Sequence, residues 1–251
     1  MNIVQSYECL NSCIVNAINY FGITLSSSDI FFLGNGLQIK YDNSDTPNIG
    51  AYLYESNFDF LDRYNYKYKH SYSNSFDSKR LIDDVLLKKK IISIKVSSTF
   101  LTYNRVFSQT SDSSHFVNII GQDENNYYIV DGYVPTLVPS VFEGYVSKEE
   151  ILRAWSAKNY EYVYIEEYKD ISNVKDEANK CFFDSIDYYI YESKSTGIYS
   201  FLSMVDDIKK YIQEPNFRQI MLDINYKIKI YGYLTSKYYI LEKIKENKNI
   251  N

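Results

Sequence analysis

The feature that most constrains the fold is a β-hairpin predicted near the middle of the chain. Two runs typical of strands, HFVNIIGQ at 115–122 and YYIVDGY at 127–133, flank the polar turn sequence DENN at 123–126. A hairpin is an antiparallel unit, and helical patterns surround this one up to about residue 168. The sequence therefore predicts an α+β fold.

The register of this hairpin predicts which side chains share a face. If Gly121 faces Tyr127, then Val117 faces Asp131, and His115 lies one step further along the same face. Alternate residues point to the same side of a sheet, so Asp131 lies diagonal to His115, within reach of its imidazole. A carboxylate oriented in this way toward a histidine is the relation found in a catalytic triad.

The nucleophile for such a triad is expected in the helix predicted at Tyr7–Gly22. Glycine favours a helix end at position 22, and Glu8 precedes the first turn, where a carboxylate suits the helix dipole. Cys9 lies at the helix start, where unpaired backbone N–H groups lower the pKa of a thiol. The buried stripe is formed by Leu10, Ile14, Ala17, Ile18 and Phe21.

Because cysteine and histidine are scarce, few residues can be the nucleophile or the base. The chain has three cysteines, Cys9, Cys13 and Cys181, an odd number that argues against a disulfide framework. Cys13 is expected to pack in the core rather than to bind a metal with Cys9, because so few histidines make a poor zinc site. Of the two histidines, His70 is expected at the surface, which leaves His115 as the base.

Three further residues receive structural rather than catalytic assignments. Asn118 and Asp123 are expected at a sheet edge and in the turn, not as replacements for Asp131. Trp155, the only tryptophan, is expected to anchor the core.

The pattern of elements changes near residue 170 and predicts two domains. Before this point, strands are expected at 37–41, 64–72, 91–96, 115–122, 127–133 and 160–168, and helices at 7–22, about 27–33, 49–63, 76–90 and 147–157. Only helical spacing follows, at 174–191, 198–212 and 217–244. We therefore expect a catalytic domain at 1–168 and an all-helical C-terminal domain at 169–251.

Charge and hydropathy exclude several classes of protein. The net charge is −5, yet residues 209–251 carry nine Lys/Arg and four Asp/Glu, and no motif for reading nucleic acid accompanies them. The N-terminus lacks the pattern of a signal peptide, and no apolar run is long enough to span a membrane. We expect a cytoplasmic protein without nucleic-acid or membrane partners.

The motifs resemble those of a known family. They are C-x12-G at Cys9–Gly22, L-S-x-x-x-I-F-x-L-G-x-G-L at Leu25–Leu37, and H-x-V-x-x-x-G followed by V-D at His115–Asp131. Together they resemble the BtrH N-terminal family, whose members are similar to papain-like cysteine peptidases. Glu8 departs from that family, which usually has a histidine or a small residue before the cysteine.

The resemblance implies a papain-like fold and an acyltransferase of natural-product (antibiotic) biosynthesis. Such an enzyme takes an acyl group from the phosphopantetheine thioester of a carrier protein and passes it to an amine, forming an amide. Carried over to this sequence, Cys9 is the nucleophile, His115 the base, Asp131 the orienting carboxylate and Gln5 a candidate oxyanion donor. The chemistry needs no cofactor and no metal.

Two alternatives share the predicted fold. A cysteine peptidase or amidase would use the same triad with water as the acceptor, and a non-catalytic binding protein would use the cleft without needing Cys9. For the acyltransferase, the basic C-terminal region is a candidate surface for an acidic carrier protein, with Lys227, Lys229 and Lys237 as its test positions.

Overall fold

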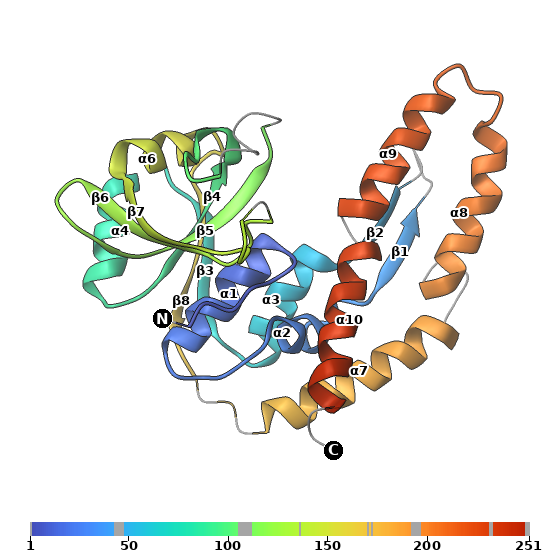
Figure 1. The fold of residues 1–251 in the computed structure, drawn as a ribbon, viewed down its shortest axis with the longest axis horizontal. Coiled ribbons are helices and arrows are strands. Elements are labelled where there is room, and N and C mark those ends of the chain that lie inside the picture. Colours follow the sequence, from blue (N-terminus) through green and yellow to red (C-terminus); the bar gives the residue numbers. More distant parts are fainter. Residues whose placement is uncertain are drawn as a thin grey trace. The chain divides into compact units, whose positions relative to one another are not determined.

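The computed structural model divides the chain into two compact units (Figure 1). Unit 1 comprises Met1–Ser27 and Tyr64–Ile171, and unit 2 comprises Ser28–Arg63 and Ser172–Asn251. The structure describes residues 2–42, 48–104, 112–135, 137–169, 171, 173–191, 197–230 and 233–248. The last boundary between the two units lies close to the domain boundary expected at residue 168. Residues 28–63, however, group with the C-terminal helices rather than with the catalytic domain.

Unit 1 is built on an antiparallel sheet of six strands, in the order β3-β8-β4-β5-β6-β7. The strands are β3 (Lys67–Tyr72), β4 (Ile92–Ser97), β5 (Ser114–Gln122), β6 (Asn126–Asp131), β7 (Phe142–Ser147) and β8 (Glu161–Glu167). Central β4 is buried along almost its whole length, as its apolar sequence predicts. β7 was not expected from the sequence, because its polar and aromatic residues show no clear alternation.

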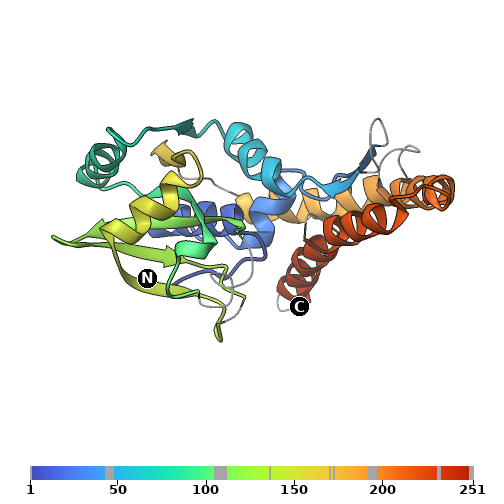
Figure 2. The same ribbon diagram turned by 90° about the horizontal axis from the view of Figure 1, so that it is seen from above.

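Helices cover both faces of this sheet. α4 (Ser78–Leu87) and α6 (Lys148–Ser156) share a core with Ile94, Val117 and Ile129, and Figure 2 shows α6 (yellow) lying across the strands. Trp155 of α6 is fully buried there and donates from Nε1 to the Glu161 carbonyl at 2.7 Å, so its role as a core anchor is confirmed. The opposite face packs against α1 (Cys9–Tyr20).

A β-bulge adjusts the register of the central hairpin. At the turn, Gln122 pairs with Tyr127 and Gly121 with Tyr128, one residue away from the predicted pairing. The register shifts between Ile119 and Gly121, so that Ile119 pairs with Ile129. The predicted register was therefore wrong at the turn and right toward the end of the hairpin that carries His115 and Asp131.

Unit 2 is mostly helical. It contains most of α2 (Ser27–Leu33), the two-stranded sheet of β1 (Ile39–Asp42) and β2 (Asn48–Ala51), α3 (Leu53–Arg63), α7 (Val174–Tyr191), α8 (Gly197–Tyr211), α9 (Phe217–Ile230) and α10 (Tyr233–Lys248). The single helix expected at 217–244 is thus two helices, and the first residues of the helix expected at 49–63 form a strand.

Residues distant in sequence hold unit 2 together. The ammonium group of Lys243 forms a buried ion pair with Asp29, and both side chains are 2% exposed. The ring of Phe31 stacks on Tyr239 with centroids 4.3 Å apart. These contacts join α2 to α10 and explain why residues 28–63 belong with the C-terminal helices.

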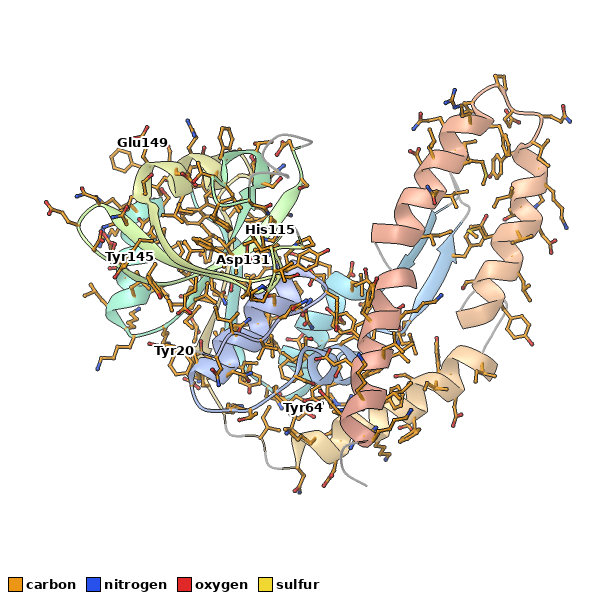
Figure 3. The ribbon with its side chains drawn as sticks, in the orientation of Figure 1. Tyr20, Tyr64, His115, Asp131, Tyr145 and Glu149 are labelled. Carbon is orange, nitrogen blue, oxygen red and sulfur yellow. The ribbon has the colours of Figure 1, made fainter. Side chains whose placement is uncertain are left out.

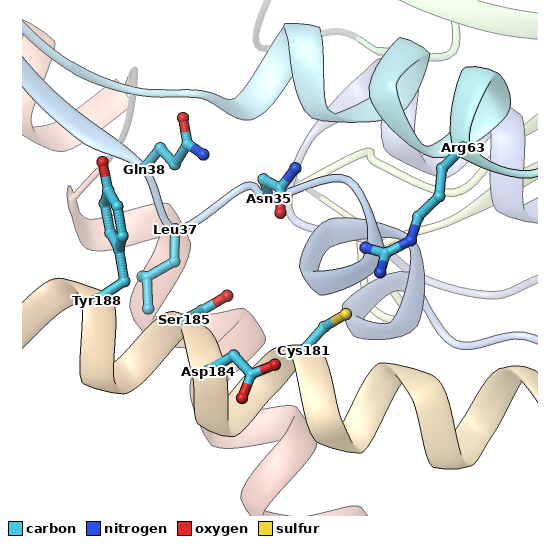
Figure 4. A pocket seen from close by; sticks show the side chains of 8 residues that line it. All are labelled: Asn35, Leu37, Gln38, Arg63, Cys181, Asp184, Ser185 and Tyr188. Atoms are coloured by element: carbon cyan, nitrogen blue, oxygen red, sulfur yellow. The ribbon is translucent and has the colours of Figure 1, made fainter.

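Unit 2 also contains a small cavity of about 220 Å³ (Figure 4). Its lining is Asn35, Leu37, Gln38, Arg63, Cys181, Asp184, Ser185 and Tyr188. None of the predicted catalytic residues belongs to this cavity. Arg63 is engaged within the same unit, since it pairs with Glu177 at 3.1 Å and donates to the Leu33 carbonyl at 3.0 Å.

Candidate functional site

The core of the candidate site is the pair formed by His115 on β5 and Asp131 on β6 (Figure 3). Nε2 of His115 lies 2.7 Å from Oδ2 of Asp131, and the two residues are only 6% and 1% exposed. The predicted hydrogen bond between them is therefore present. With Nε2 directed to the carboxylate, Nδ1 is the ring nitrogen left for a reacting group.

Two further contacts hold the Asp131 carboxylate. The hydroxyl group of Tyr103 donates to Oδ2 at 3.0 Å, and the backbone N–H of Tyr133 donates to Oδ1 at 3.0 Å. Tyr103 is itself fixed by stacking on Phe142, with ring centroids 3.9 Å apart and planes inclined by 5°. Sequence reasoning missed Tyr103, which lies in a polar connection 28 residues before Asp131.

Cys9 is the first residue of α1 and lies beside β5, but its thiol forms hydrogen bonds with groups other than the expected His115. The thiol donates to Oε1 of Glu8 at 3.3 Å, and the backbone N–H of Phe116, the residue after His115, donates to its sulfur. Within the described part of the chain, Cys9 and His115 share no direct hydrogen bond. The structure thus brings the three residues into one site and leaves the Cys9 thiol hydrogen-bonded to Glu8.

Glu8 also takes the position that the sequence assigned to the thiol. Its carboxylate caps α1, accepting from the backbone N–H groups of Leu10 at 2.9 Å and Asn11 at 2.6 Å. Burial raises the pKa of the Cys9 thiol well above its usual value, and the charges of Glu8 and Asp131 raise it further. The expected lowering of the thiol pKa was wrong, because the thiol is buried and because Glu8 compensates the positive charge of the helix N-terminus.

The electrostatics of His115 favour its protonated form. Burial alone would lower the pKa of the imidazole, but the charge and hydrogen bond of Asp131, together with the charge of Glu8, outweigh burial and raise the pKa. Both titrating groups of the site are therefore pushed toward their protonated states by the same two carboxylates.

A polar network fixes α1 on the sheet. Asn118 of β5 donates to the Cys13 carbonyl at 2.9 Å and accepts from the Ser93 hydroxyl at 2.7 Å. It is buried in the centre of the sheet, so the expectation of a sheet-edge residue was wrong. Asp123 does occupy the turn, where it accepts from two backbone N–H groups.

The end of β6 is packed closely against α1 and the N-terminal segment. The Gly132 carbonyl accepts from the Ser6 N–H at 2.9 Å, and the Asn16 side chain exchanges two 2.8 Å hydrogen bonds with the backbone of Val4. A Cβ at Gly132 would lie 2.5 Å from both the Ser12 hydroxyl oxygen and the Val4 carbonyl oxygen. Only glycine permits this approach.

Comparison with known proteins agrees with this arrangement. Residues 8–132 match the family described as "Butirosin biosynthesis protein H, N-terminal". The chain belongs to this family over these residues. The BtrH N-terminal segment thus contains Cys9 and the His115–Asp131 pair. The predicted papain-like α+β fold is confirmed, because the helix that carries the thiol packs on an antiparallel sheet that carries this pair.

No curated protein matches the chain. Among solved structures, one described as that of a C39-like peptidase from Bacillus anthracis is similar to it, with a TM-score of 0.46 and 15% identical residues. The similarity covers 67% of this chain and 96% of that one.

Three other residues considered from the sequence lie outside the hydrogen-bonded site: Cys13, Gln5 and His70. Cys13 is 1% exposed and packs in the core as expected. The Gln5 side chain is exposed, and the hydrogen bond described for this residue is from Ser27 to its backbone carbonyl, so its role as an oxyanion donor stays a prediction. His70 lies on β3 and pairs with Glu161 at 3.1 Å.

A groove adjoins the site on the side of Tyr103. It has a volume of about 540 Å³ and is lined by Thr102, Tyr103, Leu137, Phe142, Tyr145, Val146, Ser147 and Glu150. Tyr103 joins this groove to the site, since its hydroxyl group donates to the Asp131 carboxylate. The Ser147 hydroxyl caps α6 by accepting from the Glu150 N–H at 3.1 Å, and the Glu150 carboxylate accepts from the Thr102 N–H at 2.9 Å.

None of the helices in the described part of the chain is long and apolar enough to cross a membrane.

Proposed function

We propose that this protein is a cysteine-dependent acyltransferase that forms an amide during natural-product biosynthesis. The observation that carries the proposal is the hydrogen-bonded His115–Asp131 pair beside the thiol at the start of α1. Membership of a family named for butirosin biosynthesis supports the biosynthetic setting. The acyl donor is a carrier-protein thioester, and the acceptor is an amine.

The first half-reaction moves the acyl group to Cys9. His115 takes the thiol proton, the sulfur attacks the thioester carbonyl, and the carrier thiolate leaves with that proton. One C–S bond forms while another breaks, so the step is nearly thermoneutral. Asp131 holds the imidazole in position and stabilises its cationic form during the proton relay.

The second half-reaction releases the amide. The amine attacks the acyl-enzyme carbonyl, the C–N bond forms, and the Cys9 sulfur leaves and regains a proton through His115. The Phe116 N–H, directed at the sulfur, helps to stabilise that sulfur as it leaves. If water replaced the amine, the same residues would act as a thioesterase or peptidase.

The test is intact mass spectrometry of the protein incubated with an acyl-loaded carrier protein. Wild type is expected to gain one acyl group, Cys9→Ala none, and an added amine should discharge the adduct as an amide. Discharge that is equally fast without amine would indicate a hydrolase. Absence of an adduct with every donor would refute the acyltransferase and leave a binding protein as the alternative.

Carrier docking at the basic C-terminal region is a separate part of the proposal. Lys237 is exposed on α10, whereas the side chains of Lys227 and Lys229 lie outside the described residues. Lys209 and Lys210 pair with acids of their own helix, and Lys243 is buried with Asp29. Changing Lys227, Lys229 and Lys237 to Glu is expected to weaken carrier binding in a pull-down titration, and unchanged affinity would discard this surface.

A further inference from the structure

Glu8 has an unusual position for a helix cap, because the atom next to its carboxylate is the nucleophile. Oε1 accepts from the Leu10 N–H at 2.9 Å and from the Cys9 thiol at 3.3 Å, while Oε2 accepts from Asn11 at 2.6 Å. The helix hydrogen bonds hold the carboxylate in place. The negative charge of Glu8 therefore stays beside the reacting sulfur.

This charge opposes the first half-reaction. A carboxylate in contact with a thiol disfavours the thiolate, and Glu8 contributes to the raised pKa of both Cys9 and His115. Capping alone does not require it, because serine, threonine or asparagine caps a helix without placing a charge there. The residue is therefore better explained by a step in which positive charge approaches the sulfur.

We infer that Glu8 recognises the ammonium group of the acceptor at the acyl-Cys9 intermediate, and so favours a cationic amine over water. This inference rests on the proposed function and assigns Glu8 as its specificity-determining residue. Acylation replaces the S–H bond of Cys9 by an S–C bond, which removes the donor that the thiol directs at Oε1. An ammonium N–H then supplies a donor to that oxygen, adjacent to the acyl carbon.

The proton balance of this step is complete without another reactant. The alkylammonium ion carries three protons on nitrogen and the amide keeps one. One of the two released protons returns to the Cys9 sulfur as the C–S bond breaks. The other leaves through His115 to solvent, and Glu8 remains a carboxylate throughout.

The experiment that tests this inference does not depend on acyl transfer. The full chain is alkylated at Cys9 with 2-bromoethylammonium, which is cationic, and separately with iodoacetamide, which is neutral, and peptide mass spectrometry reads the Cys9 adduct alone. In wild type the ratio of the two rates, each scaled to free cysteine, is expected to favour the cationic reagent. Glu8→Gln, which retains an oxygen for the cap, is expected to lower that ratio about fivefold.

Glu124→Gln provides the matched control. Glu124 is an exposed carboxylate in the hairpin turn, so its substitution removes the same net charge away from the thiol. A ratio that is unchanged in Glu8→Gln, or lowered equally by Glu124→Gln, would overturn the inference. Because the ratio cancels any change in thiol pKa, a general gain in Cys9 reactivity cannot imitate the expected result.

A second measurement applies once the acyl-enzyme is available. Discharge by n-butylamine, a cation at neutral pH, is compared with discharge by hydroxylamine, which is neutral there. Glu8→Gln is expected to slow the first relative to the second, and an unchanged ratio would contradict the inference. Failure to form the acyl-enzyme would refute the proposed function while leaving the alkylation result to decide the role of Glu8.

Discussion

Gly132→Ala tests whether the close packing at the end of β6 positions the catalytic residues. Gly132 follows Asp131 directly, and a Cβ there would lie 2.5 Å from the Ser12 hydroxyl oxygen and from the Val4 carbonyl oxygen, and 2.9 Å from the Asn16 amide nitrogen. Ordinary contacts with carbon begin near 3.5 Å, so α1 and the N-terminal segment must move by roughly 1 Å relative to the strand.

The expected loss of stability follows from this crowding. Forcing one extra methyl group into a well-packed interior costs about 1–3 kcal/mol. The neighbours of Gly132 cannot all relax, because Val4 and Asn16 are joined by two hydrogen bonds and the Gly132 carbonyl holds the Ser6 N–H. Urea unfolding, followed by circular dichroism, measures this change in the free energy of unfolding.

The expected loss of activity is larger than the loss of stability predicts. Cys9 is carried by α1 and Asp131 by β6, so a shift of about 1 Å between these elements displaces the nucleophile from its base, and such a displacement can reduce a rate by about 100-fold. We expect acyl-Cys9 formation to fall by roughly 10–100-fold under conditions in which the variant is fully folded.

Gly121→Ala is the control for this prediction. A Cβ at Gly121 would meet nothing closer than the Tyr128 Cβ at 3.7 Å, an ordinary contact on the same hairpin. This variant should keep both its stability and its acylation rate near those of wild type. If Gly132→Ala behaved in the same way in both assays, the packing at Gly132 would not position the site, and the reasoning would be wrong.

Four other substitutions test the electrostatics and the two units. Asp131→Asn removes the charge that raises the pKa of His115, so the imidazole should titrate at lower pH by NMR. Because the raised pKa means that protonated His115 stabilises the fold, wild type should lose this stabilisation as the pH rises through that pKa, and the variant should lose less. Tyr103→Phe keeps the stacked ring but deletes the hydrogen bond to Asp131, which should lower stability by about 0.5–1.5 kcal/mol in urea unfolding. Lys243→Met removes the cation that is paired with the buried Asp29 carboxylate and should cost about 3–5 kcal/mol in unfolding of unit 2, whereas Lys209→Met, in an exposed pair, should cost less than about 1 kcal/mol. Equal effects of the two lysine substitutions would contradict the importance of burial.

The His115–Asp131 pair could be predicted because its signals are local. Alternation along two short runs and a polar turn define a hairpin, and the hairpin alone brings residues 115 and 131 together. The bulge between Ile119 and Gly121 could not be predicted, since it depends on how the strands meet their neighbours. The bulge compensates for the register error made at the turn. The predicted pairing near His115 and Asp131 was therefore right, although the sequence pattern does not show the bulge.

The pKa of Cys9 was mispredicted although the deciding residue adjoins it. The helix-end argument treats the first N–H groups as available to the sulfur, yet Glu8 accepts from two of them. Whether an acid before a helix caps it or points to solvent depends on one side-chain torsion, which periodicity does not encode. Tyr103 was missed, and Asn118 was wrongly placed at a sheet edge, because their partners lie 28 and 105 residues away.

The grouping of residues 28–63 with the C-terminal helices has a similar cause. The sequence of α2 predicts a helix and its cap, but not the helix against which it packs. That choice is made by contacts such as Asp29 with Lys243, 214 residues apart. An element assignment can be read locally, whereas a domain boundary depends on partners that only the folded chain reveals.

In the proposed mechanism, the charge of Glu8 has opposite effects on the two half-reactions. Burial and the charges of Glu8 and Asp131 raise the pKa of the thiol, and both charges raise the pKa of the imidazole, so formation of the Cys9 thiolate is disfavoured before a substrate binds. A nucleophile kept neutral in this way must be generated on contact with a bound thioester. In the proposed acyl-enzyme, the charge of Glu8 would then attract a cation toward the acyl carbon. An active site that only hydrolysed its substrate would gain nothing from a fixed negative charge at the sulfur, whereas one that must choose an amine over water gains selectivity from it.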